Sequence, residues 1–148
     1  MDTEQLEKYM KADKWITEIY GGVFPKDLLP HSPERPSLFI VNLDKSDQPG
    51  SHWVVVFVVD RKISEYFDPL GKVPDTDFKN YLTQQSRSYR YSDKRCQNYA
   101  SNICGQYCLF YCYFRARGYS MQHILNMFDE NNLLYNDQLV YYFYEYTN

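Results

Sequence analysis

The sequence of 148 residues lacks a long apolar run and carries almost no excess charge. Its purest apolar stretch, 54–59, stops at the charged residues 60–62 and falls far short of the roughly 18 residues of a membrane-spanning helix. The net charge of −3 disfavours a chain built as a whole to bind nucleic acid or an anionic membrane. Residues 1–4 lack the basic start and apolar run of a secretory signal. We therefore expect an intracellular protein that is not secreted and has no membrane partner.

Cysteine and histidine are scarce, with four and three residues, whereas aromatic residues make up 18% of the chain. The few cysteines are more typical of thiols in a reducing compartment than of a disulfide framework. Three of them fall at positions 104, 108 and 112, but the outer two would lie about 12 Å apart along one helix, which excludes a shared tetrahedral metal. A chain of this length and a 44% hydrophobic content supports one domain, 1–148, without metal or disulfide support.

Hydrophobic periodicity predicts alternating helices and strands in an α+β domain with a mostly antiparallel sheet flanked by helices. Helices are expected over residues 2–20, 75–82, 104–117, 120–128 and 136–146, the last by its length although its aromatic composition is strand-like. Strands are expected over residues 38–43, 52–59, 63–67 and 90–97. Four prolines make 24–37 irregular, and the unbroken apolar run after His52 indicates a central strand buried on both faces.

Cys104 stands where a loop gives way to the strongly apolar helix expected over 104–117. The first N–H groups of that helix and its dipole would stabilise a thiolate and lower the pKa of the thiol. A nucleophilic thiol also needs an imidazole that takes its proton and returns it to the leaving group. His31 lies in the proline-rich loop and His123 in a helix past the core, so His52, which opens the central strand, is the best base.

Asp68 follows the third strand directly, and pairing of 52–59 with 63–67 in a hairpin would bring it back beside His52. That carboxylate could orient the imidazole. An acyl-transfer site also needs donors for the oxyanion, and the side-chain amide of Gln97 and the backbone N–H of Cys104 are the candidates.

Four motifs taken together resemble the adenovirus-type, or adenain-like, cysteine proteases of adenoviruses and of Maverick/Polinton-type elements, in the same clan as the SUMO-specific proteases. They are Gly-Ser-His-Trp at 50–53, Tyr-Phe-Asp-Pro-Leu-Gly at 66–71, Gln97 and Cys-Gly-Gln-Tyr-Cys at 104–108. The spacing of seven from Gln97 to Cys104 is that of the adenovirus branch, whereas Asp68 is the acid of SUMO-specific proteases. The chain is shorter than the adenovirus enzymes and shows no clear counterpart of their C-terminal region.

The resemblance implies a papain-like/adenain-like protease core with the nucleophile at the N-terminus of a buried helix. It assigns the nucleophile to Cys104, the base to His52, the orienting acid to Asp68 and the oxyanion donor to Gln97. The implied activity is that of a cysteine endopeptidase that cleaves after Gly-Gly-like or Gly-X-Gly-like sites in structural precursor proteins of a virus or virus-like element. It further implies a monomer in the host nucleus or cytoplasm, packaged in the virion, that needs no cofactor except an activating peptide or DNA.

Two other functions stay open from the sequence: a protease that removes ubiquitin-like or SUMO modifiers, and a catalytically silent interaction module that uses the tyrosine-rich C-terminal surface. Basic residues interleaved with tyrosines indicate either a nucleic-acid contact or a solvated loop; they are Arg87, Arg90, Lys94 and Arg95. The stretch Ile-Tyr-Gly-Gly-Val at 19–23 resembles a cleavage site of the clan, so self-cleavage after Gly22 is one interpretation and a glycine stop of the first helix is the other.

Overall fold

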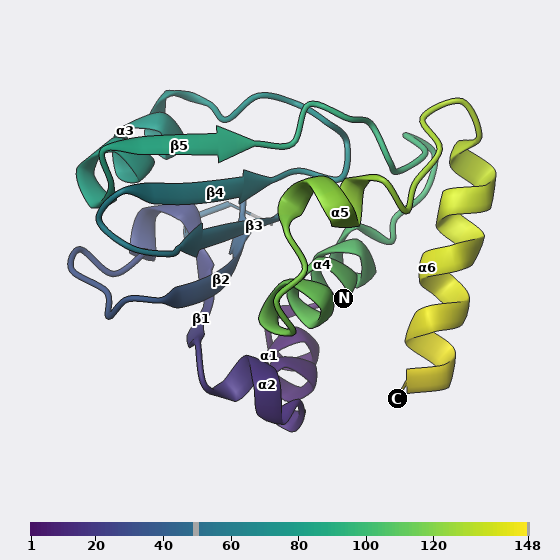
Figure 1. Ribbon diagram of the computed structural model, residues 1–148, viewed down its shortest axis with the longest axis horizontal. Coiled ribbons are helices and arrows are strands. Elements are labelled where there is room, and N and C mark those ends of the chain that lie inside the picture. Colours follow the sequence, from purple (N-terminus) through teal and green to yellow (C-terminus); the bar gives the residue numbers. More distant parts are fainter. Residues whose placement is uncertain (49–50, 148) are drawn as a thin grey trace.

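The fold is organised around one five-stranded sheet (Figure 1). The computed structural model describes residues 1–48 and 51–147, so Gly50 of the motif before His52 lies outside the described residues. In chain order the strands are β1 Tyr20–Pro25, β2 Ser37–Asn42, β3 Trp53–Val58, β4 Ile63–Phe67 and β5 Ser88–Tyr91. The strands keep this order across the sheet, so each pairs with its neighbours in sequence.

The sheet is mixed, with antiparallel pairs in the middle and parallel pairs at both edges. β3 pairs antiparallel with β2 and with β4, whereas β1 runs parallel to β2 and β5 runs parallel to β4. Every residue of β3 is buried, as its unbroken apolar composition predicts. The predicted α+β class is confirmed, and the parallel direction of the edge strands is what the sequence did not reveal.

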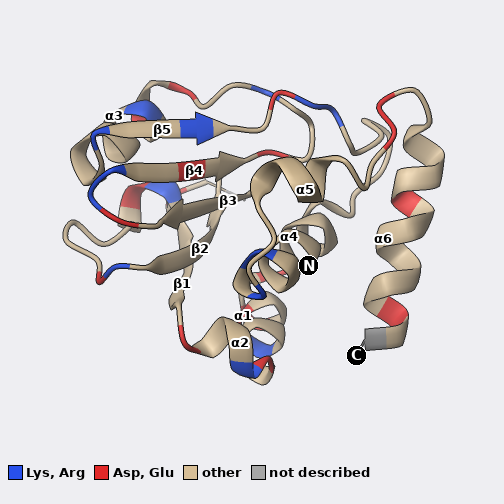
Figure 2. Ribbon diagram, in the orientation of Figure 1, with Lys and Arg blue, Asp and Glu red and all other residues tan. Residues whose placement is uncertain are grey.

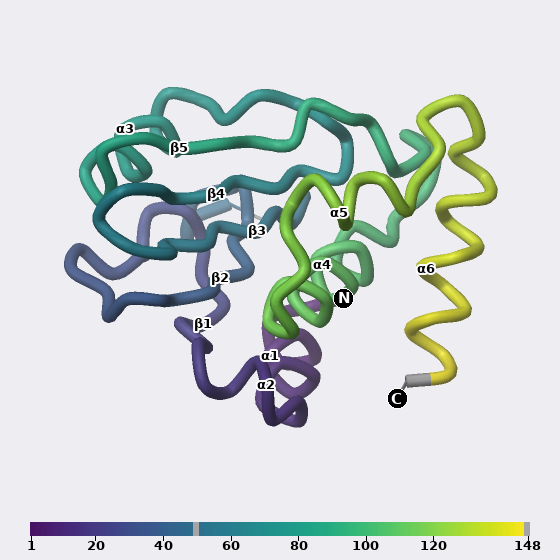
Figure 3. Tube along the Cα trace, viewed as in Figure 1, coloured from purple at the N-terminus to yellow at the C-terminus, as the bar shows by residue number. Residues whose placement is uncertain are grey.

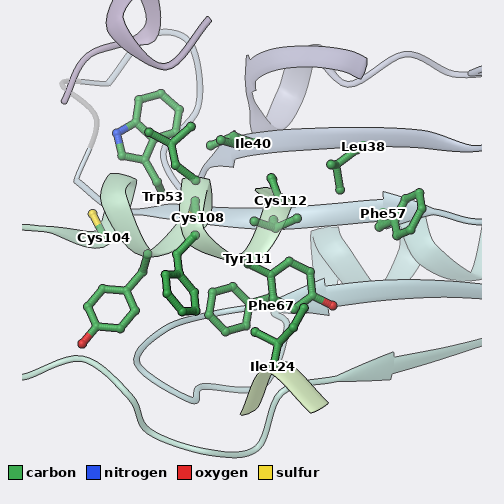
Figure 4. Close-up of a cluster of buried hydrophobic side chains, with 14 of the residues drawn as sticks. Leu38, Ile40, Trp53, Phe57, Phe67, Cys104, Cys108, Tyr111, Cys112 and Ile124 are labelled. Carbon is green, nitrogen blue, oxygen red and sulfur yellow. The ribbon is translucent and has the colours of Figure 1, made fainter. Parts of the chain in front are cut away.

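Helices cover both faces of the sheet, and each face has its own apolar core. The helices are α1 Thr3–Ala12, α2 Lys14–Thr17, α3 Thr76–Gln85, α4 Cys104–Ala116, α5 Met121–Leu125 and α6 Leu133–Thr147, with a 3-10 turn η1 at Lys26–Leu28. The smaller core lies between the sheet and α3, and the larger one holds residues of the other five α-helices. Within it α4 packs on β3, and its cysteines Cys108 and Cys112 belong to the same buried cluster as Trp53 and Phe57 of that strand (Figure 4). The buried helix expected over 104–117 is therefore confirmed.

The single helix predicted over residues 2–20 is wrong in its second half, where the chain forms a short separate helix and the start of a strand. Asp13 adopts an extended backbone and its carboxylate accepts the N–H groups of Trp15 and Ile16, so α1 ends and α2 begins there. Asp2 caps α1 at its N-terminus. Tyr20–Pro25 forms β1, so neither Gly21-Gly22 as a helix stop nor a wholly irregular 24–37 is correct. Proline at the end of an edge strand is tolerated because its missing N–H lies outside the ladder.

The expected strand over 90–97 is also largely wrong, because only its first two residues belong to β5. Beyond Ser92 the chain leaves the sheet and hydrogen-bonds to the loop after β4, where the Pro69 carbonyl accepts the N–H groups of Cys96 and Gln97. The traced chain shows this loop running beside the one that follows β4 before it turns into α4 (Figure 3). The helices expected over 75–82, 120–128 and 136–146 are present as α3, α5 and α6.

Candidate active site

His52 and Asp68 lie side by side at one end of the β3–β4 hairpin. His52 directly precedes β3, Asp68 directly follows β4, and the antiparallel pair Val55–Phe67 fixes their approach. The His52 Nε2 atom lies 2.8 Å from Asp68 Oδ1, and the two side chains are 11% and 1% exposed. The structure thus brings together the imidazole and carboxylate that the hairpin argument predicted.

A tight turn holds Asp68 in place. Its Oδ1 also accepts the Leu70 N–H at 2.8 Å, and the Asp68 N–H donates to Ser92 Oγ at 3.0 Å. The turn closes with the Gly71 N–H donating to the Asp68 carbonyl, and Gly71 has φ 73°. A Cβ at Gly71 would come within 2.7 Å of the Arg95 backbone nitrogen, so only glycine fits between the two loops. The carboxylate is therefore fixed before any substrate arrives.

Cys104 is the first residue of α4, where the sequence placed it, and is 9% exposed. Burial raises the pKa of its thiol, but hydrogen bonds from His52 and from the backbone N–H groups of Trp53 and Gly105 outweigh burial and lower the pKa below 9.0. The donors at the helix start act as the dipole argument expects. The Cys104 thiol therefore ionises more readily than an ordinary cysteine thiol.

The His52 imidazole shifts in the complementary direction. Burial lowers its pKa, but the hydrogen bonds with Asp68 and Cys104 and the attraction of their negative charges raise the pKa to about 9. A lowered thiol pKa beside a raised imidazole pKa favours a thiolate–imidazolium pair. The Asp68–His52–Cys104 chain can therefore hold a nucleophile and its proton in readiness.

Gln97 reaches the same site from the loop after β5. The Pro69 carbonyl accepts its backbone N–H at 2.9 Å, so the turn that places Asp68 also places Gln97. Its side-chain Nε2 donates to the carbonyl and to the Oγ of Ser101, each at 3.2 Å, while Oε1 is buried and has no partner among the described residues. The structure brings Gln97 to the site with its amide engaged by Ser101, so contact with an oxyanion requires the amide to turn.

Two cavities meet at Cys104. The larger, of about 420 Å³, is bounded by Trp53, by Asn42–Gln48 loop residues and by the N-terminal residues 1–3. The smaller, of about 260 Å³, is bounded by Ser51, His52, Leu70, Gln97, Tyr99, Ser101, Asn102 and Cys104. The thiol is thus open to an extended ligand that fills both.

Some residues of the site were not singled out from the sequence. Asn102 borders both cavities, and its position near Cys104 in the sequence is the signal that could have found it. The Met1 carbonyl accepts the Trp53 indole N–H at 3.0 Å, which brings the N-terminal segment beside the start of α4. No local sequence pattern predicts this contact, because the two residues are 52 positions apart in the sequence.

The three other cysteines border neither of the two cavities. All four cysteines are free thiols, as expected, and Cys96, Cys108 and Cys112 are fully buried with pKa values raised by burial. Within residues 1–48 and 51–147, no three His, Cys, Asp or Glu side chains are grouped to hold a metal ion. None of the helices described in those ranges is long and apolar enough to cross a bilayer.

The basic residues singled out between 87 and 95 face separate partners. Arg90 lies 3.7 Å from the buried Glu65, and Lys94 donates to the carbonyls of Leu125 and Phe128. Arg95 stacks on Tyr99 beside the smaller cavity. The nucleic-acid contact stays a prediction, and only part of the segment is free for it.

A mixed sheet carrying a thiol at the start of a buried helix is the architecture of the adenain and SUMO-protease-like clan of cysteine proteases. No family model and no curated protein matches the chain. Two solved crystal structures of the ASFV pS273R protease, one of them of the selenomethionine protein, each match 70% of this chain with a TM-score of 0.50. The sequence identities are 27% and 24%, and the chain spans 44% and 42% of the length of those proteins. The likeness supports the clan that the motifs indicated.

Proposed function

We propose that the chain acts as a cysteine endopeptidase of viral type, with Cys104 as nucleophile and His52 as general base and acid. The observation that carries the proposal is the 2.8 Å contact of His52 with Asp68 in the same cavity as Cys104, where two cavities meet, together with the influence of His52 that lowers the pKa of the Cys104 thiol. The structural similarity to the ASFV pS273R protease supports it. Because the chain spans less than half of that protein, its activity and substrates are proposals for this chain.

In the proposed reaction the Cys104 thiolate attacks the scissile carbonyl, and the C–N bond breaks after a tetrahedral intermediate. The Cys104 backbone N–H and a turned Gln97 amide stabilise the oxyanion. The His52 imidazolium gives its proton to the leaving amine, and water activated by the neutral imidazole then releases the acid product and regenerates the thiol. Asp68 holds the imidazole in the orientation that both transfers need.

The proposed substrate is a protein cut after two small residues, as in the processing of structural precursors of a virus or virus-like element. The test uses quenched peptides that carry Gly-Gly before the cut, together with intact ubiquitin-like fusions that end in Gly-Gly. We expect cleavage by the wild type and none above background by Cys104→Ser or His52→Ala. His123→Ala is the matched control because that histidine is exposed on α5, and it should keep full activity.

Three outcomes would contradict parts of the proposal. Full activity of His52→Ala would refute the assigned base. Cleavage of fusions alone would favour removal of ubiquitin-like modifiers. Failure of a Gly-Gly peptide with a thiol-reactive group to label Cys104 in the folded protein, with and without candidate activating peptides, would favour an interaction module without catalysis.

A further inference from the structure

The two cavities that meet at Cys104 are chemically distinct, and this gives the substrate a direction. In thiol proteolysis the imidazolium must reach the leaving amine, so the segment after the cut departs on the imidazole side of the sulfur. His52 and Gln97 border the smaller cavity, whereas neither borders the larger one. The smaller cavity therefore receives the segment after the cut, and the larger one receives the acyl segment. This assignment rests on the proposed function.

Tyr99 borders the smaller cavity and carries a cationic surface formed by Arg95 and Lys72. Tyr99 is 58% exposed, and the Arg95 guanidinium lies over its ring, 3.3 Å from the centroid. The Lys72 ammonium lies 6.0 Å from the same centroid. Stacking on the ring restricts the guanidinium at little cost in solvation, because the ring quadrupole attracts the cation.

Arg95 and Lys72 come from two loops that the active-site turn fixes together. Lys72 directly follows Gly71, and Gly71 contacts the Arg95 backbone closely. Figure 2 shows basic residues on both of these loops, after β4 and after β5, where the loops run side by side. The cationic surface is therefore held in a fixed position relative to the Cys104 sulfur.

Neither cation is paired with a carboxylate in the described part of the chain. The Arg95 Nε is buried and makes no hydrogen bond there. Two buried or half-buried carboxylates of the surrounding loops and helix are engaged elsewhere, since Asp68 bonds His52 and Asp137 accepts the Tyr107 hydroxyl at 2.7 Å. An arginine fixed on one face presents N–H donors along its edge, in the geometry that a carboxylate accepts.

We propose that Arg95, supported by Tyr99 and Lys72, binds an acidic side chain within the first three residues after the cut. The site thereby selects, among proteins with small residues before the cut, those whose following segment carries Asp or Glu.

A binding experiment tests this without turnover. Fluorescent peptides carry Gly-Gly followed by three positions, one of which is Glu, Gln or Lys and the others Ala, and they are titrated into Cys104→Ala protein. We expect Glu at one position to bind about fivefold more tightly than Gln, with Lys weakest, and the difference to shrink at high salt. The preference should fall in Lys72→Gln and vanish in Arg95→Gln. Arg61→Gln is the matched control, because that exposed arginine lies at the opposite end of the β3–β4 hairpin.

Equal binding of Glu and Gln peptides at all three positions, including no binding of any peptide, would overturn the acidic preference. So would a preference that persists in folded Arg95→Gln and Lys72→Gln proteins, as judged by circular dichroism. Cleavage of the same peptides by the wild type separates this inference from the proposed function. A Glu preference in binding without cleavage would contradict only the protease, whereas cleavage with equal rates for Glu and Gln would contradict only the acidic site.

Discussion

Replacing His52 by alanine should change the ionisation of Cys104 in a way that alkylation can measure. In the wild type the His52 hydrogen bond is the largest of the effects that lower the thiol pKa, and burial opposes them. The variant keeps the burial and only the N–H donors of Trp53 and Gly105. We therefore expect the pKa of its thiol to lie above that of the wild type, because burial then outweighs more of the remaining stabilisation.

The size of the effect follows from the two ionisation states. A thiol with a pKa of 9.0 is about 1% thiolate at pH 7, so loss of a fully formed ion pair cuts the thiolate population roughly a hundredfold. A thiolate of lower pKa is also a weaker nucleophile, which offsets part of that loss. The net expectation is about tenfold slower alkylation of His52→Ala at pH 7. The gap should close above pH 9, where His52 loses its proton and the variant thiol ionises.

Iodoacetamide labelling followed by intact mass from pH 5.5 to 10 measures this directly. The other three cysteines are fully buried with raised pKa values, so they should stay unlabelled in the folded protein, and Cys104→Ala checks this. The wild-type rate should stay high well below pH 9 and level off early. Identical profiles for wild type and His52→Ala, both rising only near pH 9, would refute the ion pair.

Three further variants probe the support of the site. Asp68→Asn should lower the pKa of His52 from about 9 and reduce kcat/KM roughly 10- to 100-fold, less than His52→Ala, with the pH profile shifted to match; an unchanged profile would argue against its orienting role. Gly71→Ala should cost about 1–3 kcal/mol in urea unfolding, because a left-handed φ and contact with the Arg95 backbone penalise any Cβ, and wild-type stability would contradict this. Glu65→Gln should lower the free energy of unfolding by about 3 kcal/mol, because Arg115 would lose the buried carboxylate to which it donates two hydrogen bonds. A decrease below about 1 kcal/mol in the same assay would count against a stabilising role of that pair.

The site could be predicted further than the fold around it, because its parts obey local rules. Each of three side chains is placed by the boundary of a single helix or strand. They are the thiol at the start of a helix, the histidine at the start of a strand and the acid after the next strand. Counting residues from the hairpin turn then brings His52 and Asp68 together, as the pair Val55–Phe67 allows. The sequence could not predict that the Gln97 side-chain amide donates to Ser101. This hydrogen bond depends on the conformation of the loop between them, which hydrophobic periodicity does not encode.

The first strand escaped prediction for a different reason. Residues 2–20 carry helical spacing, and the break at Asp13 depends on a side chain that competes for backbone N–H groups. Gly21 and Gly22 are poor strand formers, yet they lie in β1, where a Cβ at Gly21 would come within 2.4 Å of the Phe39 ring. Parallel pairing with β2 thus overrides local propensity, and the glycines allow the close approach.

The turn after β4 connects the separate parts of the site. Its Asp68 carboxylate contacts the His52 imidazole, its Pro69 carbonyl fixes the backbone of Gln97, and its glycine admits the loop that carries Arg95. A displacement of this turn would therefore disturb the His52 contact, the placement of Gln97 and the cationic surface together. Variants within it should lose several properties at once, whereas variants at Arg95 itself should lose only the acidic preference. Separate measurements of thiol ionisation and peptide binding on Gly71→Ala and Arg95→Gln would distinguish this coupled arrangement from three independent ones.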